Sequence, residues 1–295
     1  MVTAHTHHSD SHRVLLALLL TAVFTVVEAV SGVLTSSLAL LADAGHMLTD
    51  SMALALAAFA FRVGRRPADP RRSYGYQRVQ ILAAFANAIT LILIVGWIVV
   101  EAVSRLLTPP AVHATGMLIV AILGLLINIA AFALLHGGDR DNLNMRGAAL
   151  HVLGDLLGSV AAIVAALVIL TTGWMPVDPL LSVVVAVLIL RSAWQLLQKS
   201  AHILLEGTPD WLDVAAMQSV LVARVPAVKS IHHVHVWGLT QEQAMLTMHV
   251  VLRDTAGDFT NCVRELKGIL ASDYGIAHST IEVEGGHCAD HAEDQ

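Results

Sequence analysis

The chain has 295 residues, of which 56% are hydrophobic and only 14% are charged, and its mean hydropathy is +0.69. Ordinary soluble domains carry roughly 25% charged residues, so this composition excludes a typical water-soluble protein and indicates a membrane protein. The net charge of −6 is spread along the chain, and it offers no basic footprint for nucleic acid.

The first 13 residues are polar and rich in histidine. They contain His5, His7, His8 and His12. A short tract of this kind is expected to be a disordered tail. Weak metal collection and a chance run of histidines are equally open interpretations.

Six apolar stretches are long enough to cross a bilayer, which takes about 20 helical residues. They cover residues 14–34, 38–61, 79–103, 114–136, 147–171 and 177–197. The first exceeds the apolar core of a signal peptide and lacks a cleavage site, so we expect it to remain as a helix. The sequence therefore predicts a polytopic α-helical membrane protein with six transmembrane helices in residues 14–200.

The arginines of one loop predict how these helices are oriented. Short loops rich in Lys and Arg stay on the cytoplasmic side of the membrane. The loops at 35–37 and 172–176 have no basic residue, whereas the loop after the second stretch carries Arg62, Arg65, Arg66, Arg71, Arg72 and Arg78. We expect this loop, and with six spans both termini, to be cytoplasmic.

Residues 201–288 have the pattern of a soluble domain, followed by a short tail at 289–295. Helical periodicity at 211–225 is followed by period-two alternation in "SIHHVHVWGL" and "AMLTMHVVLR". A second helical segment, "TNCVRELKGILAS", precedes a third alternating one, "HSTIEVEG". The order α-β-β-α-β predicts a small α+β layer with one sheet and helices on one face.

Two of the apolar stretches repeat one motif, a histidine followed four residues later by an aspartate. The second stretch contains His46 and Asp50, and the fifth contains His151 and Asp155. Residues four apart share a helix face, and two such faces would supply two imidazoles and two carboxylates, a tetrahedral ligand set for a zinc-like ion. A His/Asp hydrogen bond within each helix is the alternative.

Antiparallel packing of these two spans would bring His46 near Asp155 and Asp50 near His151. The pairs differ in expected depth, about 15 Å from the outer end for the second span and about 25 Å for the fifth. Other polar residues in the spans are expected to form interhelical hydrogen bonds or to line a pathway. These are Glu28, Asp43, Asn87 and Asn128.

The motifs "SSLALLADAGHMLTDS" and "ALHVLGDLLGS" resemble those of the cation diffusion facilitator family, and more closely its bacterial zinc-exporting branch. The resemblance extends over nearly the whole chain and implies a ferredoxin-like cytoplasmic domain. It also implies a homodimer in the lipid of the bacterial inner membrane that exports Zn(II), with Cd(II) or Co(II) possible, against an inward flow of protons. The transported ion would be held by His46, Asp50, His151 and Asp155.

The resemblance also implies that zinc binds to the cytoplasmic domain. The matching positions are His232, His249, Cys262, Glu282 and Glu284. His233 and His235 are expected on the strand face opposite His232, where metal ligation is as open as a solvent-exposed face or a dimer interface. A disulfide between the two cysteines is not expected in the cytoplasm. An auxiliary site and a chance cluster are both open for His278, His287, Cys288 and His291.

Two further features of the family can be compared with this chain. Arg78 and Glu206 match a charge interlock, although Arg78 also fits a simple positive-inside anchor. A third metal site of some members lies between the second and third spans. Here Asp69 is present, but the other positions hold Arg72 and Tyr76, so we expect no metal there.

Two other functional classes fit the sequence less well. A membrane metalloenzyme would keep three protein ligands and an open position, and no HExxH motif is present, so we do not expect an enzyme. A membrane-embedded metal sensor without transport would not need an ion site in the middle of the bilayer. It remains the alternative to a transporter.

Overall fold

The computed structural model describes residues 6–64, 66–136, 143–253, 259–285 and 288. Some side chains within the helices lie outside the description, namely those of residues 6–18, 50, 53–54, 57–58, 60–61, 132, 134–136, 143–155 and 157. The chain forms two compact units, one of residues 1–57 with 86–197 and one of residues 58–85 with 198–295.

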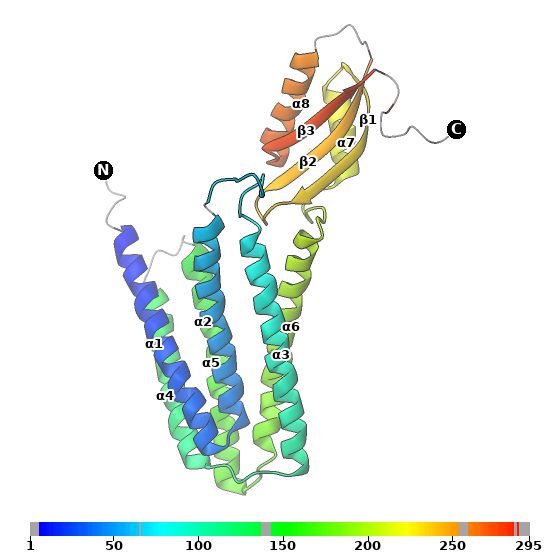
Figure 1. Cartoon of the computed structure of the whole chain (residues 1–295). Helices are drawn as coiled ribbons and strands as arrows, with labels where there is room; N and C mark the ends of the chain where they lie inside the picture. Colours follow the sequence, from blue (N-terminus) through cyan, green and yellow to red (C-terminus); the bar gives the residue numbers. More distant parts are fainter. Residues whose placement is uncertain (1–5, 65, 137–142, 254–258, 286–287, 289–295) are drawn as a thin grey trace. The chain divides into compact units, whose positions relative to one another are not determined.

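Six long helices carry the six apolar stretches (Figure 1). They are α1 (Thr6–Thr35), α2 (Leu38–Gly64), α3 (Val79–Leu107), α4 (Ala114–His136), α5 (Leu143–Thr172) and α6 (Val177–Leu204). The prediction of disorder before residue 14 is wrong for residues 6–13, which belong to α1. Once an apolar run has formed a helix, each further residue extends it at little cost, even when it is polar.

Many apolar side chains of these helices face outward. Val100 of α3 is 69% exposed and Leu93 is 68% exposed, as expected for a surface in contact with lipid rather than water. Among the described residues, three helical segments are long and apolar enough to span a membrane. They are Val79–Leu107, Ala114–Ala131 and Val177–Leu204. The first unit is therefore a membrane domain.

Helix α2 lies between two buried clusters in the first unit. One cluster joins Ala39 and Leu40, at the start of α2, to α4 and to the second half of α5, including Ala162 and Ala166. The other joins Leu38 and Ala42 of α2 to α3 and α6. The start of α2 contacts the second half of α5. The two helices are therefore antiparallel, as expected from the sequence.

The C-terminal part of the second unit contains the predicted α-β-β-α-β order. Its elements are α7 (Val214–Arg224), β1 (Val228–Gly238), β2 (Ala244–Leu252), α8 (Phe259–Tyr274) and β3 (His278–Glu284). The strand order is β1-β2-β3, with β1 antiparallel and β3 parallel to β2. Helix α8 makes the crossover that a parallel pair requires.

The two faces of this sheet have different roles. Alternate residues of β2, from Ala244 to Leu252, pack with Met217 and Leu221 of α7 and Leu266 of α8 in one apolar core. The residues between them, including His249, point to the other face. That face carries the polar side chains of a candidate site.

Candidate metal sites

The two His/Asp pairs lie in the interior of α2 and α5. The histidine and aspartate of each pair are four positions apart in a continuous helix, so they lie on the same helix face. His46 is partly buried, and the side chains of Asp50, His151 and Asp155 lie outside the described residues. The backbone, however, fixes where the four residues stand along the two helices.

A close contact between Asp43 and Gly158 sets the register of α2 against α5. A Cβ atom added to Gly158 would lie 2.3 Å from Asp43 Oδ1, so any side chain there would force Asp43 or the two helices to shift. His46 lies three residues after Asp43, and Asp155 lies three residues before Gly158. Because the two helices are antiparallel, both residues are displaced from the contact by about 4.5 Å in the same direction along the helix axes.

Asp50 lies seven residues after Asp43, and His151 lies seven residues before Gly158. Both are therefore displaced from the contact in the same direction by the same amount. The contact therefore places both His/Asp pairs at matching levels, each level combining one histidine with one aspartate. The mismatch in depth expected from the apolar stretches disappears, because helix ends are a poorer guide to level than a direct contact between helices.

Other buried polar groups lie in the same membrane unit. Asn128 Nδ2 of α4 donates to Ser159 Oγ of α5 at 3.3 Å, and both residues are fully buried. Glu28 of α1 is also fully buried, and Asp43 is 2% exposed. Asn128 thus makes the kind of interhelical hydrogen bond expected from the sequence.

A second cluster of ligand-type side chains lies in the C-terminal domain. It consists of His232, His249, Glu284 and Cys288, and one ligand atom from each lies within 4.8 Å of the others. His249 Nδ1 is 2.8 Å from Glu284 Oε1 and 3.6 Å from Cys288 Sγ. His232 Nε2 is 3.0 Å from Glu284 Oε2. Ligand atoms around a tetrahedral zinc are about 3.3 to 3.8 Å apart, so a small adjustment suffices.

Strand register explains how this cluster forms. His232 of β1 pairs with His249 of β2, and His249 pairs with Glu282 of β3. Glu284 points to the same face as Glu282, two residues along the strand. Glu282 Oε2 lies 3.6 Å from His249 Nε2, and its side chain is half exposed. Glu282 is therefore beside the cluster, facing the other nitrogen of His249.

Charge within the cluster favours an ionised Glu284. Burial acts to raise the pKa of Glu284, but the hydrogen bonds of Cys288 and His249 and the charges of His232 and His249 together hold it below the usual range. Glu284 is only 6% exposed. An ionised, buried carboxylate beside two imidazoles is a suitable ligand for a divalent cation.

The structure does not bring Cys262 to this cluster. Cys262 lies on α8 and is buried in the apolar core with Leu266. Burial, with a smaller effect of Glu265, raises the pKa of its thiol. A protonated thiol on the covered face of the sheet is a packing group, because metal binding requires a thiolate.

The placement of His233 and His235 corrects an expectation from the sequence. Strand β1 has a bulge between His232 and His235, and His233 has a φ of +47°. The extra residue puts His235 opposite Thr247, on the face that carries His249, and the ring of His233 lies 5.1 Å from that of His249. The expectation that both lie opposite His232 is wrong, because it assumed a regular strand.

Sequence reasoning missed Cys288 as a member of this cluster and missed the bulge. Cys288 follows Glu284 by only four residues, which is close enough for the chain to return it to the site. The bulge also had a signal. Ile231 and Val234 both pack against the core, and their spacing of three breaks the alternation that Val234 and Val236 then resume.

The loop between α2 and α3 uses Asp69 as a structural acceptor. Asp69 Oδ1 accepts from Arg71 N and Arg72 N, both at 2.8 Å, and Oδ2 accepts from Tyr76 Oη at 2.7 Å. These bonds, the Tyr76 bond first, lower the pKa of Asp69 despite a smaller opposing effect of burial. The guanidinium of Arg72 lies over the Tyr76 ring and donates to its hydroxyl.

The predicted interlock residues form an ion pair within the second unit. Arg78 Nη1 lies 3.1 Å from Glu206 Oε1, and the two side chains are 34% and 63% exposed. Glu206, two residues after the end of α6, has a φ of +61°. This pair joins the start of α3 to the segment that leads into the C-terminal domain, and at such exposure it contributes about 0 to 1 kcal/mol.

Comparison with known proteins places both parts of the chain in one family. The model of the cation efflux transmembrane domain matches residues 14–205, and that of the cation efflux protein cytoplasmic domain matches residues 209–285. The zinc transporter ZitB of Pectobacterium atrosepticum is 50% identical over 97% of this chain and 89% of its own.

Two further relatives differ in the part of the chain they cover. A cadmium, cobalt and zinc/H(+)-K(+) antiporter of Bacillus velezensis is 42% identical over 95% of this chain and 91% of its own. The solved metal-bound C-terminal domain of the CzcD transporter from Cuprividus metallidurans is 42% identical, covers 25% of this chain and 99% of its own, and gives a TM-score of 0.23.

Proposed function

We propose that this chain, which belongs to the cation efflux family, exports Zn(II) from the cytoplasm in exchange for protons. Relatives named as a zinc transporter and as a cadmium, cobalt and zinc/H(+)-K(+) antiporter support the metal and the counter-ion. Cd(II) and Co(II) are further candidate substrates, since imidazole and carboxylate ligands accept them as well.

The transported ion is held between α2 and α5 by His46, Asp50, His151 and Asp155. The observation that carries this assignment is the Asp43–Gly158 contact, because it sets the two ligand pairs at matching levels. Two imidazoles and two carboxylates complete a tetrahedral zinc shell without water. The ion in turn offsets the cost of two carboxylates within a membrane, about 2.5 to 3.5 kcal/mol each on insertion scales.

Proton exchange follows from the chemistry of these ligands. Carboxylate and imidazole bind metal only when they are deprotonated, so zinc and protons compete for the same atoms. Histidine titrates near neutral pH, which allows the competition at physiological proton concentrations. Protons entering from the outer side displace zinc there, and cytoplasmic zinc displaces the protons on the inner side.

The family membership also supports a proposed arrangement in the membrane. All six helices, α1 to α6, cross the bacterial inner membrane, and the arginine-rich loop and both termini are cytoplasmic. The C-terminal domain has the ferredoxin-like fold that the family resemblance implies. The protein acts as a homodimer in the lipid membrane. The described order α7-β1-β2-α8-β3 and the match to the family's cytoplasmic domain support this arrangement.

The cytoplasmic domain binds a zinc ion of its own through His232, His249, Glu284 and Cys288. Their donor atoms already converge to within 4.8 Å, and they combine nitrogen, oxygen and sulfur ligands that suit zinc. Glu282 orients His249 from the other side of its ring. Cys262 has no part in this site.

Transport of zinc by the purified protein tests this function. The protein is reconstituted in vesicles with the arginine-rich loop outside, the lumen is made acidic, and zinc entering the lumen is followed with a fluorescent indicator. We expect uptake that stops when a protonophore collapses the pH gradient. Zinc binding without any gradient-dependent uptake would instead favour a metal sensor.

A further inference from the structure

The turn between α1 and α2 is held by contacts from three other elements. Ser36 follows the last residue of α1 with a left-handed φ of +56°, and Ser37 N donates to Gly32 O at 3.0 Å. Arg105 Nη1 of α3 donates to Ser36 O at 2.5 Å, and the backbone N–H of His113, just before α4, donates to Thr35 O at 3.0 Å. The third element is α6.

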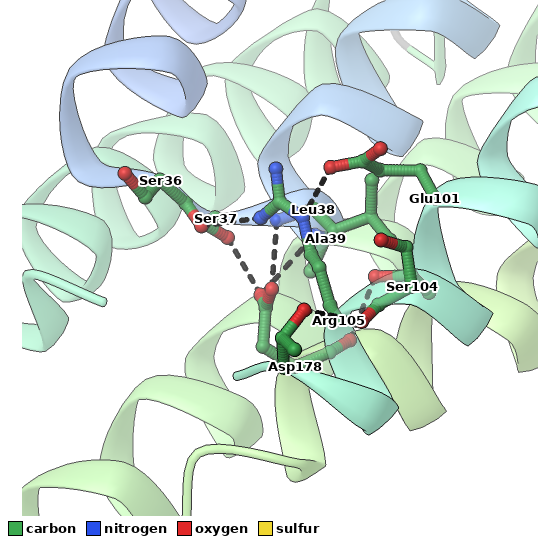
Figure 2. Close-up of polar contacts among 10 residues, drawn as sticks. Ser36, Ser37, Leu38, Ala39, Glu101, Ser104, Arg105 and Asp178 are labelled. Carbon is green, nitrogen blue, oxygen red and sulfur yellow. Dashed lines mark hydrogen bonds and ion pairs between the residues drawn. The ribbon is translucent and has the colours of Figure 1, made fainter. Parts of the chain in front are cut away.

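The contact from α6 is made by a fully buried carboxylate, that of Asp178. Its Oδ1 accepts from Ser37 Oγ at 2.7 Å and from Ala39 N at 3.2 Å (Figure 2). Its Oδ2 accepts from Leu38 N at 2.7 Å. Leu38 and Ala39 are the first two residues of α2, whose N–H groups have no partner within the helix. An anion at this position also complements the helix dipole.

Asp178 is itself held in place. It is the second residue of α6, its N–H donates to Met175 O at 3.3 Å, and Ser182 Oγ donates to its carbonyl at 2.7 Å. A side chain of α6 therefore takes over the capping of α2, supplementing Ser37, whose Oγ accepts from Leu40 N at 3.3 Å. The start of α2 is fixed to α6 rather than only to its own turn.

We propose that Asp178 is a positioning residue for transport, which sets the level and rotation of the metal-binding face of α2. This inference rests on the proposed function. His46 and Asp50 lie about 12 and 18 Å along the helix from Leu38, so Asp178 is too distant to be a ligand. A helix is stiff, so a displacement at its start is passed on to His46 and Asp50. Helix α5 does not share this cap, and its ligands would not follow.

A loss of this cap would therefore misalign the two halves of the site. In Asp178→Asn an amide NH2 replaces one acceptor oxygen, so it must face either Leu38 N–H or Ala39 N–H, and the charge at the helix start is lost. The side-chain volume stays almost the same. A substitution that only weakened the fold would reduce the amount of active protein but would leave the affinity of each remaining molecule unchanged.

Flux measurements separate these two effects. In vesicles, zinc and cadmium uptake by full-length protein is measured over a range of metal concentrations. We expect Asp178→Asn to raise the KM for zinc about tenfold. We also expect the ratio of the KM values for zinc and cadmium to change, because the larger cadmium ion tolerates longer ligand distances. Ser37→Ala should shift both quantities in the same direction by a smaller factor.

Asp213→Asn is the matched control. Asp213 caps α7 in the cytoplasmic domain by accepting from Ala216 N at 3.0 Å, and its replacement should leave the KM for zinc unchanged. A reduced maximal rate in Asp178→Asn with wild-type KM and KM ratio would overturn the inference. If Asp178→Asn does not insert, a wild-type KM and KM ratio in Ser37→Ala would overturn it. Absence of zinc flux in the wild type would refute the proposed function instead.

Discussion

Replacing Gly158 by alanine tests the register of α2 against α5, on which the quartet of His46, Asp50, His151 and Asp155 depends. The new Cβ would lie 2.3 Å from Asp43 Oδ1 and 2.8 Å from Asp43 Cγ, whereas ordinary contacts begin at 3.4 Å. Because Asp43 is buried and has a short side chain, α2 and α5 must separate or rotate by about 1 Å to accommodate it. Metal–ligand distances tolerate only about 0.2 Å, so the four ligands would no longer fit one zinc ion.

The expected loss can be stated from the cost of overpacking, about 1 to 3 kcal/mol, which corresponds to a factor of about 5 to 150 in zinc affinity. The assay is the initial rate of zinc uptake over a range of zinc concentrations. Gly96→Ala is the control, since a Cβ at Gly96 in α3 would meet nothing within 4 Å. Adding Gly158→Ala to Asp43→Ala should cost little, because the clashing carboxylate is absent. Equal kinetics for Gly158→Ala and Gly96→Ala would refute the register.

Three further predictions concern the second unit. Cys288→Ser should weaken zinc binding by the cytoplasmic domain in calorimetric titration, whereas Cys262→Ser should preserve it and lower thermal stability by about 1 to 3 kcal/mol; the opposite pattern would restore Cys262 as a ligand. The pKa of Asp69 is lowered in the folded protein, so its stabilising effect is full above the ordinary aspartate value of about 3.9 and is lost as pH falls below it. In Asp69→Asn the melting temperature should therefore fall less steeply with decreasing pH in the acid range than it does in the wild type. An equally steep fall in both proteins would contradict this. Arg78→Gln should lower the free energy of unfolding, obtained from thermal unfolding, by less than about 1 kcal/mol. A larger loss would mean that the pair with Glu206 is more than a surface contact.

The six long helices and the repeated His/Asp motif were readable from the sequence because both follow from simple patterns of residues. Apolar runs located α1 to α6, and the four-residue spacing identified His46 with Asp50 and His151 with Asp155. The relative level of the two pairs was not readable, since it depends on one contact between Asp43 and a glycine in another helix. No local pattern indicates which glycine is required by a neighbour.

The candidate metal cluster of the C-terminal domain was readable only in part, for a related reason. His232, His249 and Glu284 lie on strands, whose alternation and pairing bring them to one face. Cys288 joins them from a segment after β3, where alternation gives no information about direction. Cys262 lies on the apolar face of α8, which packs in the core. Sequence patterns thus located side chains within elements but not the approach of one element to another.

The proposed function requires that the quartet between α2 and α5 hold the ion that is transported in exchange for protons. The most direct measurement compares zinc uptake into vesicles with an acidic lumen by the wild type, Asp50→Ala and Asp155→Ala. Asp210→Ala, in the segment before α7, serves as the control. With all four proteins inserted equally, we expect rapid uptake by the wild type and the control and none above background by the two ligand variants. Full zinc flux in either ligand variant would contradict it.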